Sequence, residues 1–317
     1  SSRTIPVSTA NSGSSASSSS PTIAPILLSA RVFPDTTTYT FSELQPYARY
    51  WLRLYFFPFA ASSPSDPYDL RSSVFTVSSN GFTLLSYHDN RHGQGNPSRP
   101  PPYLFKEYSI NVSDAGGLTL AFEPGPGSFA FVNAIEVVSM PGDIIQAELP
   151  ASVNSAIASM DSSSTAFECV HRVNVGGPAI APSNDSIGLY RTWRANESFL
   201  LAGAATGIET VSTTRASIVY PPPLQPYIAP QAVYSTGIQH DPSYGHSSSD
   251  DASSSSSSSF NISWQIPVEA GFCYMVRLHF CEIVESTAGA RVFDVFLQNE
   301  TAYRGVDLVA MKGAANA

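Results

Sequence analysis

The stretch Trp51-Leu-Arg-Leu-Tyr-Phe-Phe57 decides the fold, because a related stretch, Met275-Val-Arg-Leu-His-Phe-Cys281, stands in the second half of the chain. Side chains of a strand point alternately to its two faces, so each stretch predicts a strand with one wholly apolar face. These apolar residues are Leu52, Leu54 and Phe56 in the first stretch and Val276, Leu278 and Phe280 in the second. The arginines Arg53 and Arg277 fall on the opposite face in both.

The blocks around these two strands also come in matching order. They are Ile23–Arg31 with Ile228–Thr236 upstream, and Val74–Val77 leading to Asn80 with Val292–Val295 leading to Asn299 downstream. A repeat of this length is too long for a solenoid unit and indicates two copies of one domain. The sequence therefore predicts a domain over residues 1–143, a linker over 144–166 and a second domain over 167–317.

Composition narrows the class of protein. Of 317 residues, 13% are charged and 11% are aromatic, and the formal net charge is −9. Such a surface does not attract nucleic acid or an anionic membrane, and it favours a cationic partner. No run of about 18 apolar residues crosses the chain, so membrane contact is expected only through a segment outside it.

Short strands separated by turn residues predict an all-β fold of β-sandwiches. Asn80-Gly81 predicts a hairpin between the strands 74–77 and 82–85. The stretch 129–138 is apolar on both faces and is predicted to be a central strand. Strands are also expected over 260–264, 273–283 and 291–297, while Val170–Gly177 is read as a strand entering a turn rather than as a phosphate loop.

Several blocks in one order resemble the extracellular region of the FERONIA-type plant receptor kinases. They are Trp51–Phe59, Asn80–Leu85, Phe129–Ser139, His171–Gly177, Arg191-Thr-Trp193 and Val276–Cys281. The resemblance implies two tandem malectin-like β-sandwich (jelly-roll-like) domains on the plant cell surface, followed in the parent protein by a transmembrane helix and a cytoplasmic Ser/Thr kinase. Against the family pattern, the first domain is expected to lack its first strand and the second its closing strands.

Catalytic patterns are not apparent. His88 and His92 are four residues apart but lie in a Pro- and Gly-rich stretch, so two solvated histidines are a better interpretation than metal ligands. His279 shares a predicted strand face with Arg277 and is read as part of a polar sheet face. No nucleophile elbow and no catalytic cysteine context occur. We expect no enzymatic role for this segment, no metal and no cofactor.

Binding is the expected function. The face of the Trp51 stretch that carries Trp51, Arg53, Tyr55 and Phe57 is covered either by the second sheet of the sandwich or by another partner. The candidate ligand-binding residues for a sugar or pectin are Tyr87, Arg91, His92, Arg99, Tyr103 and Lys106, which lie in or beside one predicted loop. The alternative to a receptor ectodomain is a carbohydrate-binding malectin-like module without a kinase.

The resemblance also implies partners. In this family these are secreted basic cysteine-rich peptides, the rapid alkalinization factors, acting with a small GPI-anchored co-receptor, and wall polysaccharide is a further ligand. The plasma membrane, extracellular side, is the implied location.

Five glycosylation sequons fit an extracellular location and are expected to accept sugars. They begin at Asn111, Asn184, Asn196, Asn261 and Asn299. Of the three cysteines, Cys273 and Cys281 are about 26 Å apart if the predicted strand is continuous, so they should not form a disulfide, whereas Cys169 could meet either.

Overall fold

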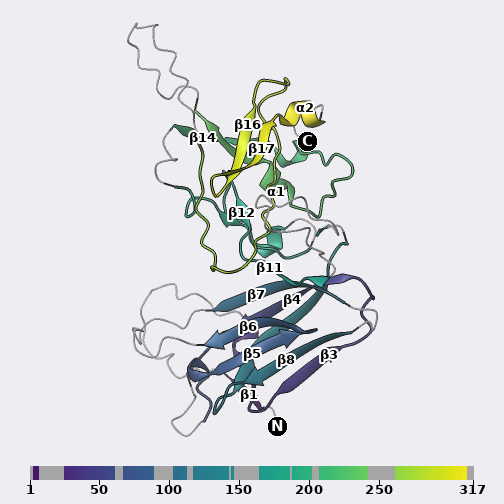
Figure 1. The fold of residues 1–317 in the computed structure, drawn as a ribbon, viewed down its shortest axis with the longest axis vertical. Coiled ribbons are helices and arrows are strands. Elements are labelled where there is room, and N and C mark those ends of the chain that lie inside the picture. Colours follow the sequence, from purple (N-terminus) through teal and green to yellow (C-terminus); the bar gives the residue numbers. More distant parts are fainter. Residues whose placement is uncertain are drawn as a thin grey trace. The chain divides into compact units, whose positions relative to one another are not determined.

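Two compact units make up the computed structural model, which describes residues 3–6, 25–60, 67–88, 103–112, 117–142, 144–145, 164–185, 188–201, 207–241 and 261–312 (Figure 1). Unit 1 holds the described residues up to Cys169, and unit 2 those from Val170 onward. The all-β prediction is confirmed, since the α-helices α1 (Gln231–Tyr234) and α2 (Leu308–Lys312) have four and five residues. None of the helices in the described ranges has the length and apolar character needed to span a bilayer.

Unit 1 is a pair of antiparallel four-stranded sheets with a smaller three-stranded sheet beside them. Its strands are β1 (Arg3–Pro6), β2 (Ser29–Phe33), β3 (Thr37–Phe41), β4 (Arg49–Phe56), β5 (Val74–Ser79), β6 (Phe82–His88), β7 (Leu104–Asn111), β8 (Leu118–Pro124), β9 (Ala130–Val132), β10 (Ala134–Ser139) and β11 (Phe167–Glu168), and its 3-10 helices are η1 (Pro25–Leu27) and η2 (Leu70–Ser72). The strand orders are β10-β4-β7-β11, β3-β8-β5-β6 and β1-β2-β9. Strand β11 lies in a stretch assigned by sequence to the second domain, yet it pairs with β7 of unit 1.

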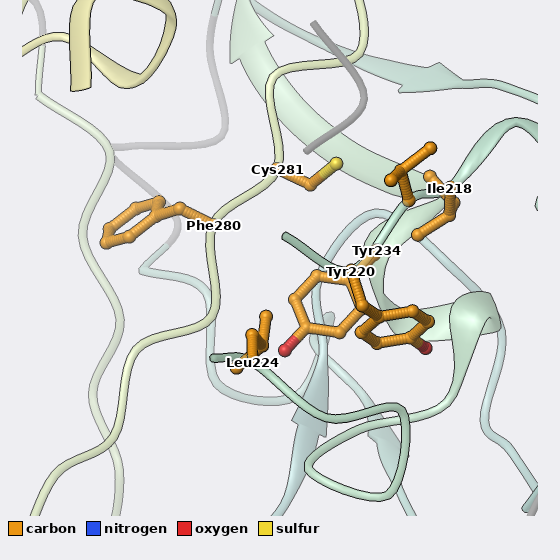
Figure 2. A pocket seen from close by; sticks show the side chains of 7 residues that line it. Ile218, Tyr220, Leu224, Tyr234, Phe280 and Cys281 are labelled. Carbon is orange, nitrogen blue, oxygen red and sulfur yellow. The ribbon is translucent and has the colours of Figure 1, made fainter. Parts of the chain in front are cut away.

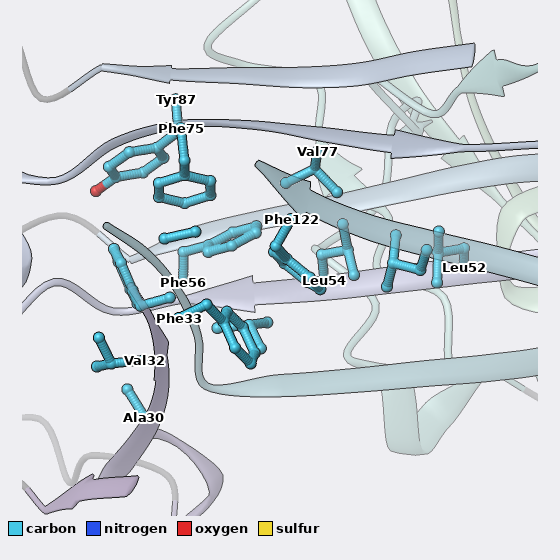
Figure 3. Packing of buried hydrophobic residues seen from close by; sticks show 14 of the residues in the cluster. Ala30, Val32, Phe33, Leu52, Leu54, Phe56, Phe75, Val77, Tyr87 and Phe122 are labelled. Atoms are coloured by element: carbon cyan, nitrogen blue, oxygen red, sulfur yellow. The ribbon is translucent and has the colours of Figure 1, made fainter. Parts of the chain in front are cut away.

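The core of unit 1 lies between the two four-stranded sheets. Leu52, Leu54 and Phe56 of β4 are fully buried, and the close-up shows them facing Phe75 and Phe122 of the opposite sheet (Figure 3). The alternation seen in the sequence thus assigns the apolar face of β4 to the sandwich interior. Burying a large apolar side chain contributes about 1.5–3 kcal/mol, so this face accounts for much of the stability of unit 1.

The predicted hairpin at Asn80-Gly81 is confirmed. Strands β5 and β6 pair around it, and Asn80 and Gly81 have φ angles of 46° and 85°. Two successive positive φ angles are the mark of the tight turn that matches the twist of a hairpin, and glycine reaches them without strain.

The prediction of one central strand over 129–138 is wrong, because the stretch forms two shorter strands. It divides at Asn133 into β9 and β10, which belong to different sheets, and β10 is the edge strand beside β4. The Asn133 side chain accepts a hydrogen bond from the Phe57 N–H at 2.6 Å and donates to the Ser29 carbonyl at 2.9 Å. All three residues of β9 are buried in the core of unit 1, and from β10 Ile135 and Val137 pack against the same core.

Unit 2 contains shorter ladders. Its elements are β12 (Val173–Asn174), β13 (Arg194–Ala195), β14 (Ile208–Ser212), β15 (Thr236–His240), β16 (Phe293–Leu297), β17 (Glu300–Val306), the 3-10 helices η4 (Pro182–Asn184) and η6 (Arg215–Ser217), and the α-helices α1 and α2. The strands pair as β12-β13, β14-β15 and β16-β17. A small core gathers around α1, where Val233 and Tyr234 pack with Trp193 and Ile218.

The predicted strand over 273–283 is wrong as well, because these residues are extended but pair with no strand among those described. The predicted alternation does not appear in the burial of its side chains, because Tyr274 and Met275, from opposite predicted faces, are 40% and 42% exposed. Val276, Leu278 and Phe280 are 50%, 47% and 41% exposed, while Cys281 packs against the α1 core. The second predicted strand, over 260–264, is reduced to a single bridge between Trp264 and Leu200.

Candidate functional site

The outer face of the β4 sheet, turned away from the sandwich core, carries the most distinctive polar arrangement of unit 1. Register pairs Arg53 of β4 with Glu107 of β7 on one side and with Glu136 of β10 on the other. Tyr55, two residues along, pairs with Phe105 in the same way. Since residues directly opposite in a sheet share a face, these five side chains stand together.

Arg53 is the centre of this arrangement. Its Nε donates to the Glu107 carboxylate at 2.7 Å, and its Nη1 donates to the Glu136 carboxylate at 3.2 Å. The side chains of Arg53 and Glu107 are 3% and 2% exposed, whereas that of Glu136 is 42% exposed. Among the described residues, two carboxylates contact one guanidinium, and of the two only the Glu136 carboxylate is exposed.

Tyr55 joins Glu136 to a group of aromatic rings. The Tyr55 hydroxyl donates to its other carboxylate oxygen at 2.9 Å. The Tyr55 ring centroid lies 6.2 Å from that of Tyr103 and 5.1 Å from that of Phe105. Tyr103 and Phe105 are 46% and 39% exposed, so an exposed aromatic row borders the carboxylate.

Burial and the nearby carboxylate keep both phenols protonated. Burial, the hydrogen bond to Glu136 and its charge raise the pKa of Tyr55 well above its ordinary value. Burial and the Glu136 charge raise the pKa of Tyr103 to about 12. Both side chains are therefore neutral across the physiological range and present π faces rather than charge.

A second set of contacts braces the other end of the face. Arg49 donates to the Ser109 hydroxyl at 2.9 Å and the Thr165 carbonyl at 2.8 Å, and its guanidinium lies 5.2 Å from the centroid of the Phe167 ring. Trp51, between Arg49 and Arg53, is 3% exposed. The second sheet covers the apolar face of β4, so the interpretation that it covers this polar face is wrong.

Unit 2 has its own buried ion pair in the Arg191-Thr-Trp193 motif. Arg191 and Asp185 meet at 2.8 Å with side chains 3% and 0% exposed, and Arg191 also donates to the carbonyls of Tyr227 and Ile228. The Arg191 guanidinium lies 5.8 Å from the Trp193 ring centroid. Because the Arg191–Asp185 pair is hydrogen-bonded and shielded from solvent, it stabilises the fold of unit 2.

His279 joins the same region from the extended stretch 272–283. Its Nδ1 lies 2.9 Å from the Tyr234 hydroxyl, and its ring packs edge to face against Trp193. Burial, together with the charges of Arg277 and Arg191, lowers the pKa of His279 to about 4. The predicted polar sheet face is therefore a buried contact with a neutral imidazole.

Beside it, a small hollow opens among Ile218, Tyr220, Leu224, Tyr234 and Cys281 (Figure 2). Burial and the Glu282 charge raise the pKa of the Cys281 thiol to about 11, so it stays protonated and unreactive near neutral pH. Cys273 and Cys281 are not joined by a disulfide, and Cys169 lies in unit 1, where its N–H donates to the Glu107 carbonyl at 2.8 Å.

The ligand-binding residues predicted from sequence separate in the structure. Tyr87 is corrected from a loop residue to a core residue: it lies in β6, is 7% exposed, and stacks on Phe75 at 4.7 Å. Lys106 lies on β7 and forms an ion pair with Glu168 at 2.5 Å. Tyr103 does reach the outer face. Arg91, His92 and Arg99 lie outside the described residues.

Sequence reasoning missed Tyr55, Phe105 and Glu136 as partners of Tyr103. The available signal was that Tyr55 stands on the non-core face of the Trp51 stretch. The positions of Phe105 and Glu136 follow only from strand register.

The sequons occupy different environments. Asn184, Asn261 and Asn299 are exposed, and Asn111 is half-buried at the end of β7. Asn196 is 2% exposed, and its side-chain oxygen accepts a hydrogen bond from the Gly176 N–H at 2.8 Å. A glycan on this buried amide would not fit the fold.

Across the ranges that the structure describes, no three His, Cys, Asp or Glu side chains gather as a metal site requires.

Comparison with known proteins identifies the family. The malectin-like domain matches residues 6–316. In Arabidopsis thaliana, the probable receptor-like protein kinase At4g39110 is 37% identical over 289 residues, covering 91% of this chain and 30% of the relative. The Arabidopsis receptor-like protein kinase FERONIA is 34% identical over 295 residues, covering 89% of this chain and 30% of the relative.

Solved structures agree with this. The crystal structure of the plant receptor-like kinase FER matches with a TM-score of 0.73 and 31% identity, covering 99% of this chain and 75% of that one. FER in complex with the plant peptide RALF23 and LLG2 matches with a TM-score of 0.73 and 30% identity, covering 99% and 76%. The extracellular domain of ANXUR1 from Arabidopsis thaliana matches with a TM-score of 0.74 and 28% identity, covering 95% and 75%.

These matches confirm the resemblance to FERONIA-type receptor kinases and indicate an extracellular region of the cell surface. The chain spans 30% of the length of the curated relatives given above. It belongs to the malectin-like domain family of plant receptor-like kinases.

Proposed function

We propose that this chain is the ligand-sensing extracellular part of a plasma-membrane receptor-like Ser/Thr kinase. Its ligand is a secreted basic peptide of the rapid alkalinization type, bound together with a GPI-anchored co-receptor. Wall polysaccharide is a further ligand, and catalysis belongs to a kinase domain outside these residues.

The observation that carries this proposal is the similarity to FER in its complex with RALF23 and LLG2, which covers 99% of this chain. The charge of the chain supports it, since a net charge of −9 and a pI of about 5.0 favour association with a basic peptide. Unit 1 adds an exposed carboxylate, that of Glu136, beside a buried Arg–Glu ion pair.

The experiment is a titration of the secreted chain with RALF23 peptide, in the presence and absence of LLG2, by calorimetry. We expect saturable binding that weakens as salt rises, because the attraction between opposite charges is screened. No heat change with RALF23 under either condition, at peptide concentrations up to about 100 μM, would contradict the proposal.

The alternative, a carbohydrate-binding module without a kinase, is favoured by one observation. The rings of Tyr103 and Phe105 are exposed beside a carboxylate, and aromatic rings with nearby acceptors suit the faces and hydroxyls of sugars. Titration with cellohexaose and with trigalacturonate distinguishes the two functions. Binding of either sugar without any response to RALF23 would favour the module.

A further inference from the structure

The outer face of the β4 sheet carries a group of side chains that we name the Tyr55 cluster: Tyr55, Tyr103, Phe105 and Glu136, with the buried pair Arg53 and Glu107 beside them. We propose that the Tyr55 cluster binds a guanidinium or ammonium group of a basic peptide. This inference deepens the proposed function, on which it rests, because it gives the place and the chemistry of one contact.

The charge of Glu136 favours a cationic ligand. The Arg53–Glu107 pair is buried at 2.7 Å and neutral as a unit, which leaves the charge of Glu136 only partly compensated at 3.2 Å. With Glu136 42% exposed, the excess negative charge faces solvent. A cation satisfies this excess, while an anionic sugar such as galacturonate is repelled by it.

The aromatic rings of the Tyr55 cluster also favour a cation. Tyr55 contacts Tyr103 and Phe105, with centroid separations of 6.2 and 5.1 Å. The two outer rings are 46% and 39% exposed. Cations bind over aromatic faces within about 6 Å of the ring centroid, and a carboxylate beside such rings adds a charged acceptor. Exposed rings that share Tyr55 with an exposed carboxylate thus offer both kinds of contact to a basic side chain.

The Glu136 carboxylate is held in place by its neighbours. One oxygen of Glu136 accepts from the Tyr55 hydroxyl at 2.9 Å, and the other accepts from Arg53. Each carboxylate oxygen can accept a second hydrogen bond, so both retain capacity for a ligand. Because Tyr55 is flanked on β4 by the fully buried Leu54 and Phe56, the carboxylate is held before the ligand arrives, which lowers the entropic cost of binding.

The test uses the secreted chain and a hexa-arginine peptide, titrated calorimetrically at about 0.15 M salt. We expect Glu136→Gln to weaken binding about tenfold, because it removes the charge while the amide keeps the size of the side chain and one acceptor oxygen. The matched control is Glu123→Gln, the same change at an exposed carboxylate on β8 of the opposite sheet, which should change affinity less than about twofold.

The rings are tested separately. Tyr103→Ala should weaken binding of hexa-arginine several-fold, and Tyr103→Phe should preserve it, because the π face rather than the hydroxyl makes the contact. Thermal unfolding of each variant, followed by circular dichroism, shows whether the fold is retained. Phe105→Ala is the second variant if Tyr103→Ala does not fold.

Three results would overturn the inference. One is equal affinity of hexa-arginine for wild type and Glu136→Gln. Another is an equal loss in Glu136→Gln and Glu123→Gln, which would indicate diffuse charge attraction. The third is binding of cellohexaose that Tyr103→Ala abolishes, with no binding of hexa-arginine, which would make this face a glycan surface.

RALF23 separates this inference from the proposed function. If RALF23 binds wild type and Glu136→Gln equally, the proposed function stands and the cluster is not its contact. If hexa-arginine loses affinity in Glu136→Gln while RALF23 fails to bind wild type, the cluster is a cation site and the proposed function is wrong.

Discussion

Gly176 occupies a backbone position that no other residue fits. Its φ is 72°, and a Cβ atom there would lie 2.3 Å from the carbonyl oxygen of Gly237 in β15. The turn at the end of Val170–Gly177 therefore brings two backbone segments close together. Its N–H also donates to Asn196, which ties the turn to the sequon.

We predict that Gly176→Ala lowers the free energy of unfolding by about 3 kcal/mol, because backbone strain and overlap with a backbone oxygen add together. Urea denaturation measures it. The control is Gly188→Ala, where φ is 68° and no atom lies within 4 Å of the added Cβ, so only the strain of about 1–2 kcal/mol remains. Equal losses in the two variants would contradict the close approach.

Glycan occupancy should follow exposure. We predict that protein from a plant or insect secretory host carries sugars on Asn184, Asn261 and Asn299, and that Asn196 is unmodified because its amide is buried and hydrogen-bonded. Peptide mass mapping checks each site. An occupied Asn196 in folded protein would show that the turn around Gly176 differs from this structure.

His279 should make the stability of unit 2 depend on pH. Its pKa is about 4 in the folded state and about 6.5 when unfolded, so the unfolded chain binds the proton more tightly. The contribution of neutral His279 is therefore fully present above pH 6.5 and is lost as pH falls towards 4. The loss amounts to about 3 kcal/mol.

Urea denaturation between pH 7.5 and pH 4.5 measures this effect, as a decrease in unfolding free energy. In His279→Gln the decrease should become smaller, since the group that titrates is gone. An unchanged pH dependence would show that other groups cause it.

At the scale of elements, alternating apolar and polar residues predicted a strand correctly where a neighbouring strand forms a ladder with it. Strand β4 and the β5–β6 hairpin follow directly from alternation and from Asn80-Gly81. The stretch over 129–138 was not predictable in form, because a crossing between sheets at Asn133 depends on hydrogen bonds to distant segments. The same pattern without a partner, over 273–283, remains extended but unpaired among the described strands.

The candidate site was predictable only in part. Tyr103 could be proposed from sequence as an exposed aromatic residue. Its neighbours Tyr55 and Glu136 come from strands far apart in the chain and are joined by register. Tyr87 was misplaced because β6 continues to His88, opposite Val74, and carries Tyr87 into the core.

The exposed row of unit 2 should promote self-association. Val276, Leu278 and Phe280 are 41–50% exposed, and contiguous exposed apolar surface favours association. We predict that Leu278→Ser with Phe280→Ser shifts sedimentation velocity profiles toward monomer. Met311→Ser, an isolated exposed residue of α2, is the control and should have little effect.

At the scale of the whole molecule, the division into two domains is a prediction that calorimetry can test. Each unit has its own core, one between the β4 and β5 sheets and one around α1. We expect two thermal transitions. Glu107→Gln, which weakens a buried ion pair of unit 1, should lower one of them, and Gly176→Ala should lower the other. A single transition that both variants shift equally would contradict independent folding.

Alternation along β4 gives this molecule a practical property. Even-numbered positions from Leu52 to Phe56 are fixed by the core, whereas Arg53 and Tyr55 stand on the outer face. Because neighbouring side chains point to opposite sides, the exposed outer positions around Tyr55 can be varied in a library while the interior and the buried Arg53–Glu107 pair stay constant. The scaffold is therefore suited to directed evolution of receptors with altered ligand preference, with β7 and β10 supplying the flanking positions.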